Sequence, residues 1–262
     1  MQTAAPVRDL NEQDLPIHRI SLTRPLRWLA LGWRDTIAAR PYSLVYGGAV
    51  ALFGLLVTLT LTWEGYGFLV PFLVAGFYLV APAIGLGLVQ MSANLEKGNK
   101  LEFCQALEAL RGNQGQLGMV IAGLSIIAQV WIAANFVLYA LLYTGFDPTL
   151  ERFFNTVFFS EEGRGFAIAS LLVGFVLAWA AFAISAISIP MLVDRDVDGW
   201  TAIRTSVRAV ARNWAAMTLW AGLIVAVIAI GFSPLYLGLV VALPVIGHAT
   251  WYAYRDLVPG PA

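Results

Sequence analysis

The stretch SVRAVARNWAAMTLW (206–220) changes character halfway along its length. Its first half places Arg208 and Arg212 four residues apart, which is the spacing of neighbours on one face of a helix. From Trp214 onward the chain is apolar for about the length of one membrane crossing. A basic amphipathic helix that continues directly into an apolar helix predicts a chain that lies on a membrane surface and then enters the membrane.

The composition is that of a membrane protein and not of a soluble domain. Of the 262 residues, 59% are hydrophobic and 12% are charged, whereas soluble domains carry about 25% charged residues. Lysine and arginine together number 16, as do aspartate and glutamate, and we expect no nucleic-acid partner. The one cysteine, Cys104, excludes a disulfide framework and any cysteine-based metal cluster within a single chain.

Six stretches without Asp, Glu, Lys or Arg are long enough to cross the hydrocarbon core, which takes about 20 residues. They are residues 42–63, 67–91, 117–143, 166–193, 214–232 and 235–254. In lipid each backbone polar group must find its partner inside its own segment, so these stretches are expected to be helices. We therefore predict an all-α integral membrane protein with six transmembrane helices as three hairpins. They form one domain over 17–258, between a poorly ordered tail at 1–16 and a short tail at 259–262.

The basic residues predict which side of the membrane each loop faces. Fourteen of the 16 lysines and arginines lie in the two termini and in the loops 92–116 and 194–213. The remaining two, Arg152 and Arg164, lie on the opposite side. Because basic residues in short loops stay in the cytoplasm, we expect a multi-pass protein of the bacterial inner membrane with both termini cytoplasmic.

A short amphipathic helix precedes each odd-numbered span, so the chain consists of three copies of an amphipathic helix followed by a membrane hairpin. The apolar stripes are Leu22, Leu26, Leu29, Trp33 and Ile37 in the first, Phe103, Cys104, Leu107 and Leu110 in the second, and Trp200, Ile203, Val207 and Val210 in the third. We expect these helices in the cytoplasmic interface, with the stripes toward lipid or toward the bundle. Arg204, Arg208 and Arg212 are candidate contacts for anionic headgroups, each contributing about 1 kcal/mol.

His248 is the one ionisable candidate for function within the predicted spans. One interpretation makes it a metal or haem ligand or a proton-sensitive gate. The other gives it a hydrogen bond to a carbonyl freed by Pro244, or a place among the headgroups, and we favour this one. A single histidine supplies no chelating site, so a haem held between two histidines requires a partner chain. We expect no metal and no cofactor.

Each returning span carries one proline: Pro82, Pro190 or Pro244. A proline lacks the backbone N–H, so neighbouring helices or hydroxyl groups must satisfy the freed carbonyl. Packing explains these breaks, but broken helices also line binding sites in transporters. Asp194, Asp196 and Asp198 lack the further ligands of a calcium loop, and we interpret Asp198 as the cap of the third amphipathic helix.

With the repeat in place, the chain resembles the bacterial integral-membrane family catalogued as domain of unknown function 2189. The segments that carry the resemblance are GWRDTIAARPYSLVYGG (32–48), GFYLVAPAIGLGL (76–88), ISIPMLVDRDVDGWTAIRTSVRAVARN (187–213) and LPVIGHATWYAYRDLV (243–258). The resemblance implies a six-helix membrane protein and assigns no activity and no functional residue. Some members carry a label of similarity to cytochrome c oxidase subunit I, but this chain has only His248 and His18, too few histidines for a haem–copper subunit.

Two functions fit these features, and neither is enzymatic, because no catalytic motif is present. The first is an accessory, scaffold or assembly partner of another membrane complex, such as a respiratory one. The alternative is a small transporter or permease for an apolar or lipid-like cargo, which needs no buried charge. A cavity near Pro82, Pro190 and Pro244 would favour the alternative. A stoichiometric membrane-protein partner would favour the first.

Overall fold

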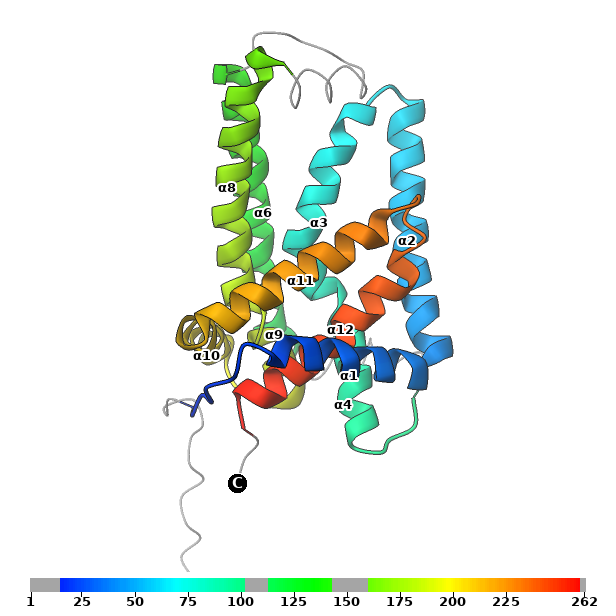
Figure 1. Cartoon of the computed structure of the whole chain (residues 1–262), viewed down its shortest axis with the longest axis vertical. Coiled ribbons are helices and arrows are strands. Elements are labelled where there is room, and N and C mark those ends of the chain that lie inside the picture. The colour runs from blue at the N-terminus through cyan, green and yellow to red at the C-terminus, as the bar shows by residue number, and fades with distance from the viewer. Residues whose placement is uncertain (1–14, 102–112, 143–159, 260–262) are drawn as a thin grey trace, which may run out of the picture.

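The computed structural model describes residues 15–101, 113–142 and 160–259, and all regular structure within these ranges is helical. Four long helices run roughly along the long axis of the molecule (Figure 1): α2 (Arg40–Trp63), α3 (Val70–Ile84), α6 (Gln114–Leu142) and α8 (Glu161–Ser185). A one-turn helix, η1 (Gly67–Leu69), precedes α3. We refer to α2, α3, α6 and α8 as the long helices.

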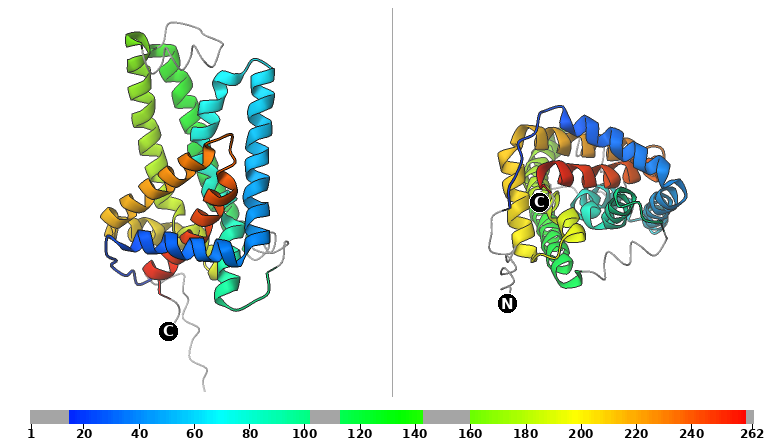
Figure 2. Two further views of the ribbon diagram at one scale, coloured as in Figure 1. Left: turned by 45° about the vertical axis from the view of Figure 1, so that its right-hand side comes forward. Right: turned by 90° about the horizontal axis from the view of Figure 1, so that it is seen from below.

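A second group of helices gathers at one end of the molecule, which is the lower end in Figure 1. It contains α1 (Arg24–Ala38), α4 (Leu86–Glu96), α9 (Ser188–Asp194), α10 (Gly199–Arg212) and α12 (Leu239–Leu257), and we call it the lower layer. Helix α1 lies across the ends of the long helices, and α11 (Trp214–Phe232) rises at a slant. The turn between α11 and α12 reaches only part of the way up α2 (Figure 2).

Two of the predicted spans are broken helices. The second span divides into α3 and α4 at Gly85, just after Pro82, and the fourth divides into α8 and α9, with Pro190 in the first turn of α9. Hydroxyl groups bond the carbonyls near the second break: Ser185 Oγ donates to Ala181 O at 2.7 Å, and Ser188 Oγ donates to Ile184 O at 2.6 Å. Two of the three predicted breaks thus fall beside their prolines, whereas Pro244 lies inside the unbroken helix α12.

Within the described ranges, five helical segments are long and apolar enough to span a membrane, where the sequence predicted six. These segments are Arg40–Trp63, Val70–Glu96, Gln114–Leu142, Gly163–Asp194 and Trp214–Phe232. The sixth predicted span, 235–254, corresponds to α12, which is not one of them. The helix begins four residues late because Leu235 and Tyr236 have left-handed backbone, with φ of 47° and 66°. It then continues through Arg255 and Asp256. Compared with the predicted span, α12 therefore lacks the apolar residues 235–238 and includes two charged residues.

Helix α12 is the core of the lower layer. Of its 19 residues, 13 are buried, and it packs against α1, α2, α4 and α11. The view from below shows it enclosed by these helices (Figure 2). Glycines permit the close approach: a Cβ at Gly32 of α1 would lie 2.4 Å from Val245 O, and one at Gly47 of α2 would lie 2.5 Å from Val240 O.

The first amphipathic helix, α1, turns most of its apolar stripe outward. On α1 and just before it, Leu22, Leu26, Trp33 and Ile37 are exposed and Leu29 is half-buried, while the opposite face, which includes Trp28 and Asp35, is buried. Of the two orientations that the sequence left open, toward lipid or toward the bundle, this stripe takes the outward one. The second predicted amphipathic helix, with Phe103, Cys104, Leu107 and Leu110, lies outside the described residues.

Helix α10 follows a related arrangement with small residues inward. Trp200 and Val207 of its predicted stripe are exposed, Ile203 is half-buried and Val210 is buried. On its inner face, Ser206 Oγ donates to Ala183 O at 2.7 Å and accepts from Ile187 N at 3.1 Å. It therefore supplies hydrogen-bond partners for two backbone groups at the break between α8 and α9. The predicted cap is confirmed, since the Asp198 side chain accepts from Thr201 N at 2.8 Å.

Candidate functional site

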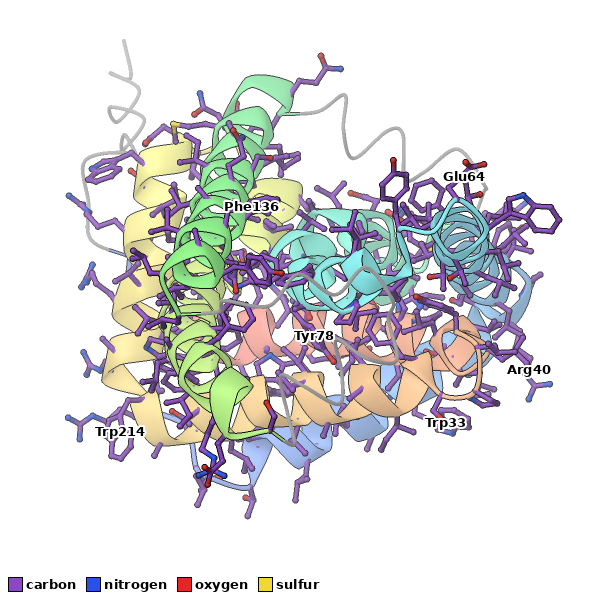
Figure 3. The ribbon with its side chains drawn as sticks, turned by 90° about the horizontal axis from the view of Figure 1, so that it is seen from above. Trp33, Arg40, Glu64, Tyr78, Phe136 and Trp214 are labelled. Atoms are coloured by element: carbon purple, nitrogen blue, oxygen red, sulfur yellow. The ribbon has the colours of Figure 1, made fainter. Side chains whose placement is uncertain are left out.

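A cavity of about 100 Å³ lies where the broken helices meet. Its wall includes Tyr78 of α3, Phe182 of α8, Ile189 of α9, Trp220 of α11 and Gly247 of α12. Seen from above, Tyr78 lies in the middle of the bundle, among the long helices and α11 (Figure 3). The cavity therefore gathers residues from segments that are far apart in the sequence.

One of the three prolines singled out in the sequence lines this cavity, and the other two lie next to residues that do. Pro82 forms part of the wall, and Ile189 and Leu243, which also line it, are the immediate neighbours of Pro190 and Pro244. A proline removes one backbone hydrogen bond from a helix and its ring clashes with the preceding turn, so the helix bends or breaks there. Neighbouring helices then cannot pack against it along their whole length. A cavity near the three prolines is the observation that the sequence analysis named as favouring a transporter or permease, although Pro244 itself lies inside the unbroken helix α12.

The wall of the cavity offers an apolar surface. Three hydroxyl groups line it, and each is occupied by a backbone carbonyl: Ser185 donates to Ala181, Thr250 donates to Ile246, and Tyr78 donates to Val225. No Asp, Glu, Lys or Arg belongs to the wall as described. Ala178 on α8, one of the lining residues, is exposed, so the cavity is open at α8.

His248 lies on another side of α12, at the centre of a buried chain of hydrogen bonds. Its Nε2 lies 2.8 Å from Ser43 Oγ of α2, and its Nδ1 lies 2.8 Å from Ser92 Oγ of α4. Ser92 Oγ donates to Asp35 Oδ2 of α1 at 2.9 Å, and Tyr252 OH donates to the same oxygen at 2.7 Å. His248, Ser43, Ser92 and Asp35 are all buried, so this chain joins four helices inside the protein.

One end of this polar chain reaches the surface. Arg34 donates from Nη2 to Tyr252 OH at 3.0 Å, and its guanidinium lies over the Tyr252 ring, 5.9 Å from the centroid. These contacts, together with the carboxylate of Asp35, raise the pKa of Arg34 above its ordinary value, with the hydrogen bond to Tyr252 as the largest cause. The Arg34 side chain is largely exposed, so the chain of hydrogen bonds runs from solvent-accessible Arg34 to buried Ser43.

The structure gives His248 partners that the sequence did not suggest. We expected a hydrogen bond to a carbonyl freed by Pro244 or a place among the headgroups, but both ring nitrogens contact serine hydroxyls inside the protein. A ligand role toward haem or a metal would require Nε2 or Nδ1 to leave its serine. Among the described residues there is no group of three His, Cys, Asp or Glu side chains placed to hold a metal. That the chain binds no cofactor stays a prediction.

An ionic cluster joins α4, α9 and α12 at the lower end. Asp194 Oδ2 accepts from Tyr254 OH at 2.8 Å, and Asp194 lies 3.8 Å from the cationic nitrogens of Lys97, Arg195 and Arg255. Glu96 accepts from Trp251 Nε1 at 2.6 Å, and Arg255 donates to it from Nη2 at 3.0 Å. Asp194, after the fourth span, and Glu96, at the end of α4, therefore hold three helix ends together.

The candidate headgroup contacts lie elsewhere. Arg204 and Arg212 are exposed and Arg208 is half-buried, all on α10 and none on the wall of the cavity.

Sequence reasoning missed Asp35, Ser43 and Ser92, because single polar residues in amphipathic or apolar helices are common and form no motif. The one available signal was that Asp35 falls on the face of α1 opposite the apolar stripe, three residues after Gly32.

Comparison with known families bears on the region that holds much of the cavity wall. Residues 69–194 match the family described as "Predicted integral membrane protein (DUF2189)". The resemblance inferred from the sequence is confirmed. The match runs from η1 to the end of α9, includes the segment GFYLVAPAIGLGL (76–88), and leaves α1, α2, α10, α11 and α12 outside it.

No curated protein and no solved structure matches the chain. The family description and the five apolar helices agree that this is an integral, multi-pass membrane protein. The description of the family names no reaction, ligand or partner. A more specific function must therefore be argued from the cavity and from the exposed surfaces.

Proposed function

We propose that this membrane protein binds a small apolar or lipid-like molecule in the cavity and moves it between the lipid and the interior of the bundle. The observation that carries the proposal is an apolar cavity where the two broken spans, α3–α4 and α8–α9, meet α11 and α12. Binding sites at discontinuous helices are a recurrent feature of secondary transporters. The proposal requires no catalysis, so we expect no enzymatic activity.

The wall of the cavity indicates the class of cargo. Its hydroxyl groups are occupied by helix carbonyls, so a ligand with many polar groups would leave those groups unpaired, at a cost of about 1–3 kcal/mol for each. An aliphatic chain loses nothing there and gains about 0.8 kcal/mol per buried methylene. The cavity volume of about 100 Å³ is smaller than that of typical small-molecule sites, about 300–1,000 Å³, so only a short segment of such a chain would fit inside.

Native mass spectrometry with stearate as the probe tests this proposal. We expect one stearate to remain bound per chain, and Ala178→Trp, which fills the open side of the cavity, to reduce the bound fraction by about tenfold. Val176→Trp is the matched control, because Val176 is exposed on the same helix and does not line the cavity. Equal stearate retention by both variants, or no bound stearate in the parent chain, would contradict the proposal.

We further propose that the lower layer lies at the cytoplasmic face of the bacterial inner membrane. Its support is that 14 of the 16 basic residues belong to the termini and to the two loops expected there. With α1 lying across the helix ends and Trp33 exposed, the outward stripe fits the level of the headgroups and acyl chains. Arg204, Arg208 and Arg212 are then the proposed contacts of anionic lipid. Reporter fusions after residue 198 and after residue 258 test this sidedness, and periplasmic activity of either would contradict it.

A second candidate function is favoured by the exposure of α8. Only 6% of the residues in its apolar window are buried within the chain, and Leu171, Leu172, Phe175 and Val176 are exposed. An accessory or assembly subunit would bury this face against another membrane protein. Extraction in mild detergent followed by affinity purification tests this idea. A stoichiometric partner that is lost on Leu172→Ala and Phe175→Ala would support it, and recovery of the chain alone would contradict it.

A further inference from the structure

We propose that His248 and Asp35 form a proton-binding site, in which His248 Nε2 takes up one added proton and Asp35 balances its charge through Ser92. This site is separate from the cavity and does not depend on the function proposed for it. Its basis is the continuous chain of hydrogen bonds from Arg34 and Tyr252 at the surface to Ser43 in the interior.

The order of donors along this chain fixes the tautomer of His248. The Ser92 hydroxyl carries one hydrogen, which it donates to Asp35 Oδ2. The contact of 2.8 Å between Ser92 Oγ and His248 Nδ1 must then be donated by the ring. Neutral His248 therefore carries its hydrogen on Nδ1, and its Nε2 accepts from the Ser43 hydroxyl.

The residue at Nε2 suits a site that gains and loses a proton. A hydroxyl group both donates and accepts, so Ser43 can accept from a protonated Nε2 without moving away. Its own hydrogen can then turn to the carbonyl of Ala39, four residues earlier in the chain, which is the usual alternative for serine. The pair of serines thus accommodates both charge states, whereas a carbonyl at the position of either hydroxyl would admit only one direction of hydrogen bonding.

Charged groups around the site favour Asp35 as the counter-charge. The described hydrogen bonds join Asp35 to His248 through Ser92 alone, and no other carboxylate is joined to the ring by a described contact. The other ionisable side chains with described contacts on the packed helices are Arg24 and Arg34 on α1, Tyr42 and Tyr46 on α2, Glu96 on α4, Asp194 on α9, and Tyr252, Tyr254, Arg255 and Asp256 on α12. Helix α11 contains no acidic or basic residue.

The chain has two histidines, so His18→Gln leaves His248 as the one histidine for nitrogen-15 NMR. In histidine-labelled protein reconstituted in bilayers, we expect at pH 8 a protonated Nδ1 and a bare Nε2. On acidification Nε2 should become protonated while the helix content, followed by circular dichroism, stays unchanged. A bare Nδ1 at pH 8, or a Nε2 that stays unprotonated until the helices are lost, would overturn the proposal.

Two variants test whether Asp35 supplies the balancing charge. Asp35→Asn should move the midpoint of His248 protonation to lower pH by about one unit, because a nearby opposite charge favours the protonated form. Asp196→Asn, at an exposed position beyond α9, is the control and should leave the midpoint in place. If Asp35→Asn does not fold, Ser92→Ala interrupts the same path and should shift the midpoint in the same direction and mix the two tautomers. An unchanged midpoint and tautomer in the folded variant would overturn the proposal.

Discussion

Helix α12 of the lower layer and the long helix α8 both come from uncharged stretches predicted to span the membrane, yet they are stabilised in different ways. Helix α12 buries 13 of its 19 residues and is fastened to its neighbours by hydrogen bonds of His248, Trp251 and Tyr254. Helix α8, by contrast, has 6% of its apolar window buried. The difference teaches that hydropathy alone identifies segments that avoid water, but it does not say whether protein or lipid surrounds them.

The largest expected effect on stability comes from substituting the buried one of the two tryptophans of α1, which lie on different faces of the helix. Trp28 is fully buried, meets Trp220 edge to face at 5.5 Å, and donates from Nε1 to Asp256 Oδ2 at 2.7 Å. Trp28→Ala should lower the free energy of unfolding by about 3–5 kcal/mol. Trp33→Ala, at a side chain that is 51% exposed, should change it by less than about 0.5 kcal/mol. SDS titration in mixed micelles measures both, and equal losses would remove the contrast between the two faces.

A pair of adjacent glycines on α2 gives an intermediate effect. A Cβ at Gly47 would lie 2.5 Å from Val240 O of α12, whereas one at Gly48 would meet nothing within 4 Å. Gly47→Ala should therefore destabilise the fold by about 1–3 kcal/mol, since backbone must move. Gly48→Ala should stabilise it by about 0.5–1 kcal/mol through higher helix propensity. If the two variants unfold alike, α12 does not approach α2 as described.

The smallest expected effect concerns the cap of α10, at the edge of the lower layer. Asp198→Ala should lower the stability by about 1 kcal/mol, while Asp196→Ala, at a more exposed position, should have little effect. Hydrogen bonds from Thr201 are the main cause that lowers the pKa of Asp198 below its ordinary value. The contribution of the cap is therefore complete above the ordinary aspartate pKa and is lost as the pH falls through the lowered one. A stability difference between Asp198→Asn and the parent chain that did not shrink on acidification would contradict this.

Much of the membrane architecture could be predicted, because the requirement for internal backbone bonding depends only on long uncharged stretches. Helix α11 begins at Trp214 and ends at Phe232, as predicted, and Pro82 and Pro190 mark the two breaks beside the cavity. The sixth span was different. Its apolar length does not reveal that Leu235 and Tyr236 leave the helix or that α12 is enclosed by α1, α2, α4 and α11. Burial against other parts of the chain is a property of the tertiary packing.

In the candidate site, too, some residues could be recognised from their own segment, whereas others matter only through their contacts in the folded protein. The sequence selected Pro82, Pro190, Pro244 and His248, since each is unusual within an apolar segment. It could not select Asp35, Ser43 or Ser92, whose meaning arises only when α1, α2 and α4 surround α12. The interfacial arginines were recognisable from their spacing, but contact with anionic lipid stays a prediction.

The central claim, that α12 is surrounded by protein while the long helices face lipid, is tested most directly by labelling the unmodified chain in bilayers. A lipid-soluble diazirine reagent followed by peptide mapping reports which residues meet acyl chains. We predict heavy labelling of α8 at Leu171, Leu172, Phe175 and Val176, and little labelling between Ala242 and Tyr254 of α12. Labelling of α12 as heavy per residue as that of α8 would contradict the account.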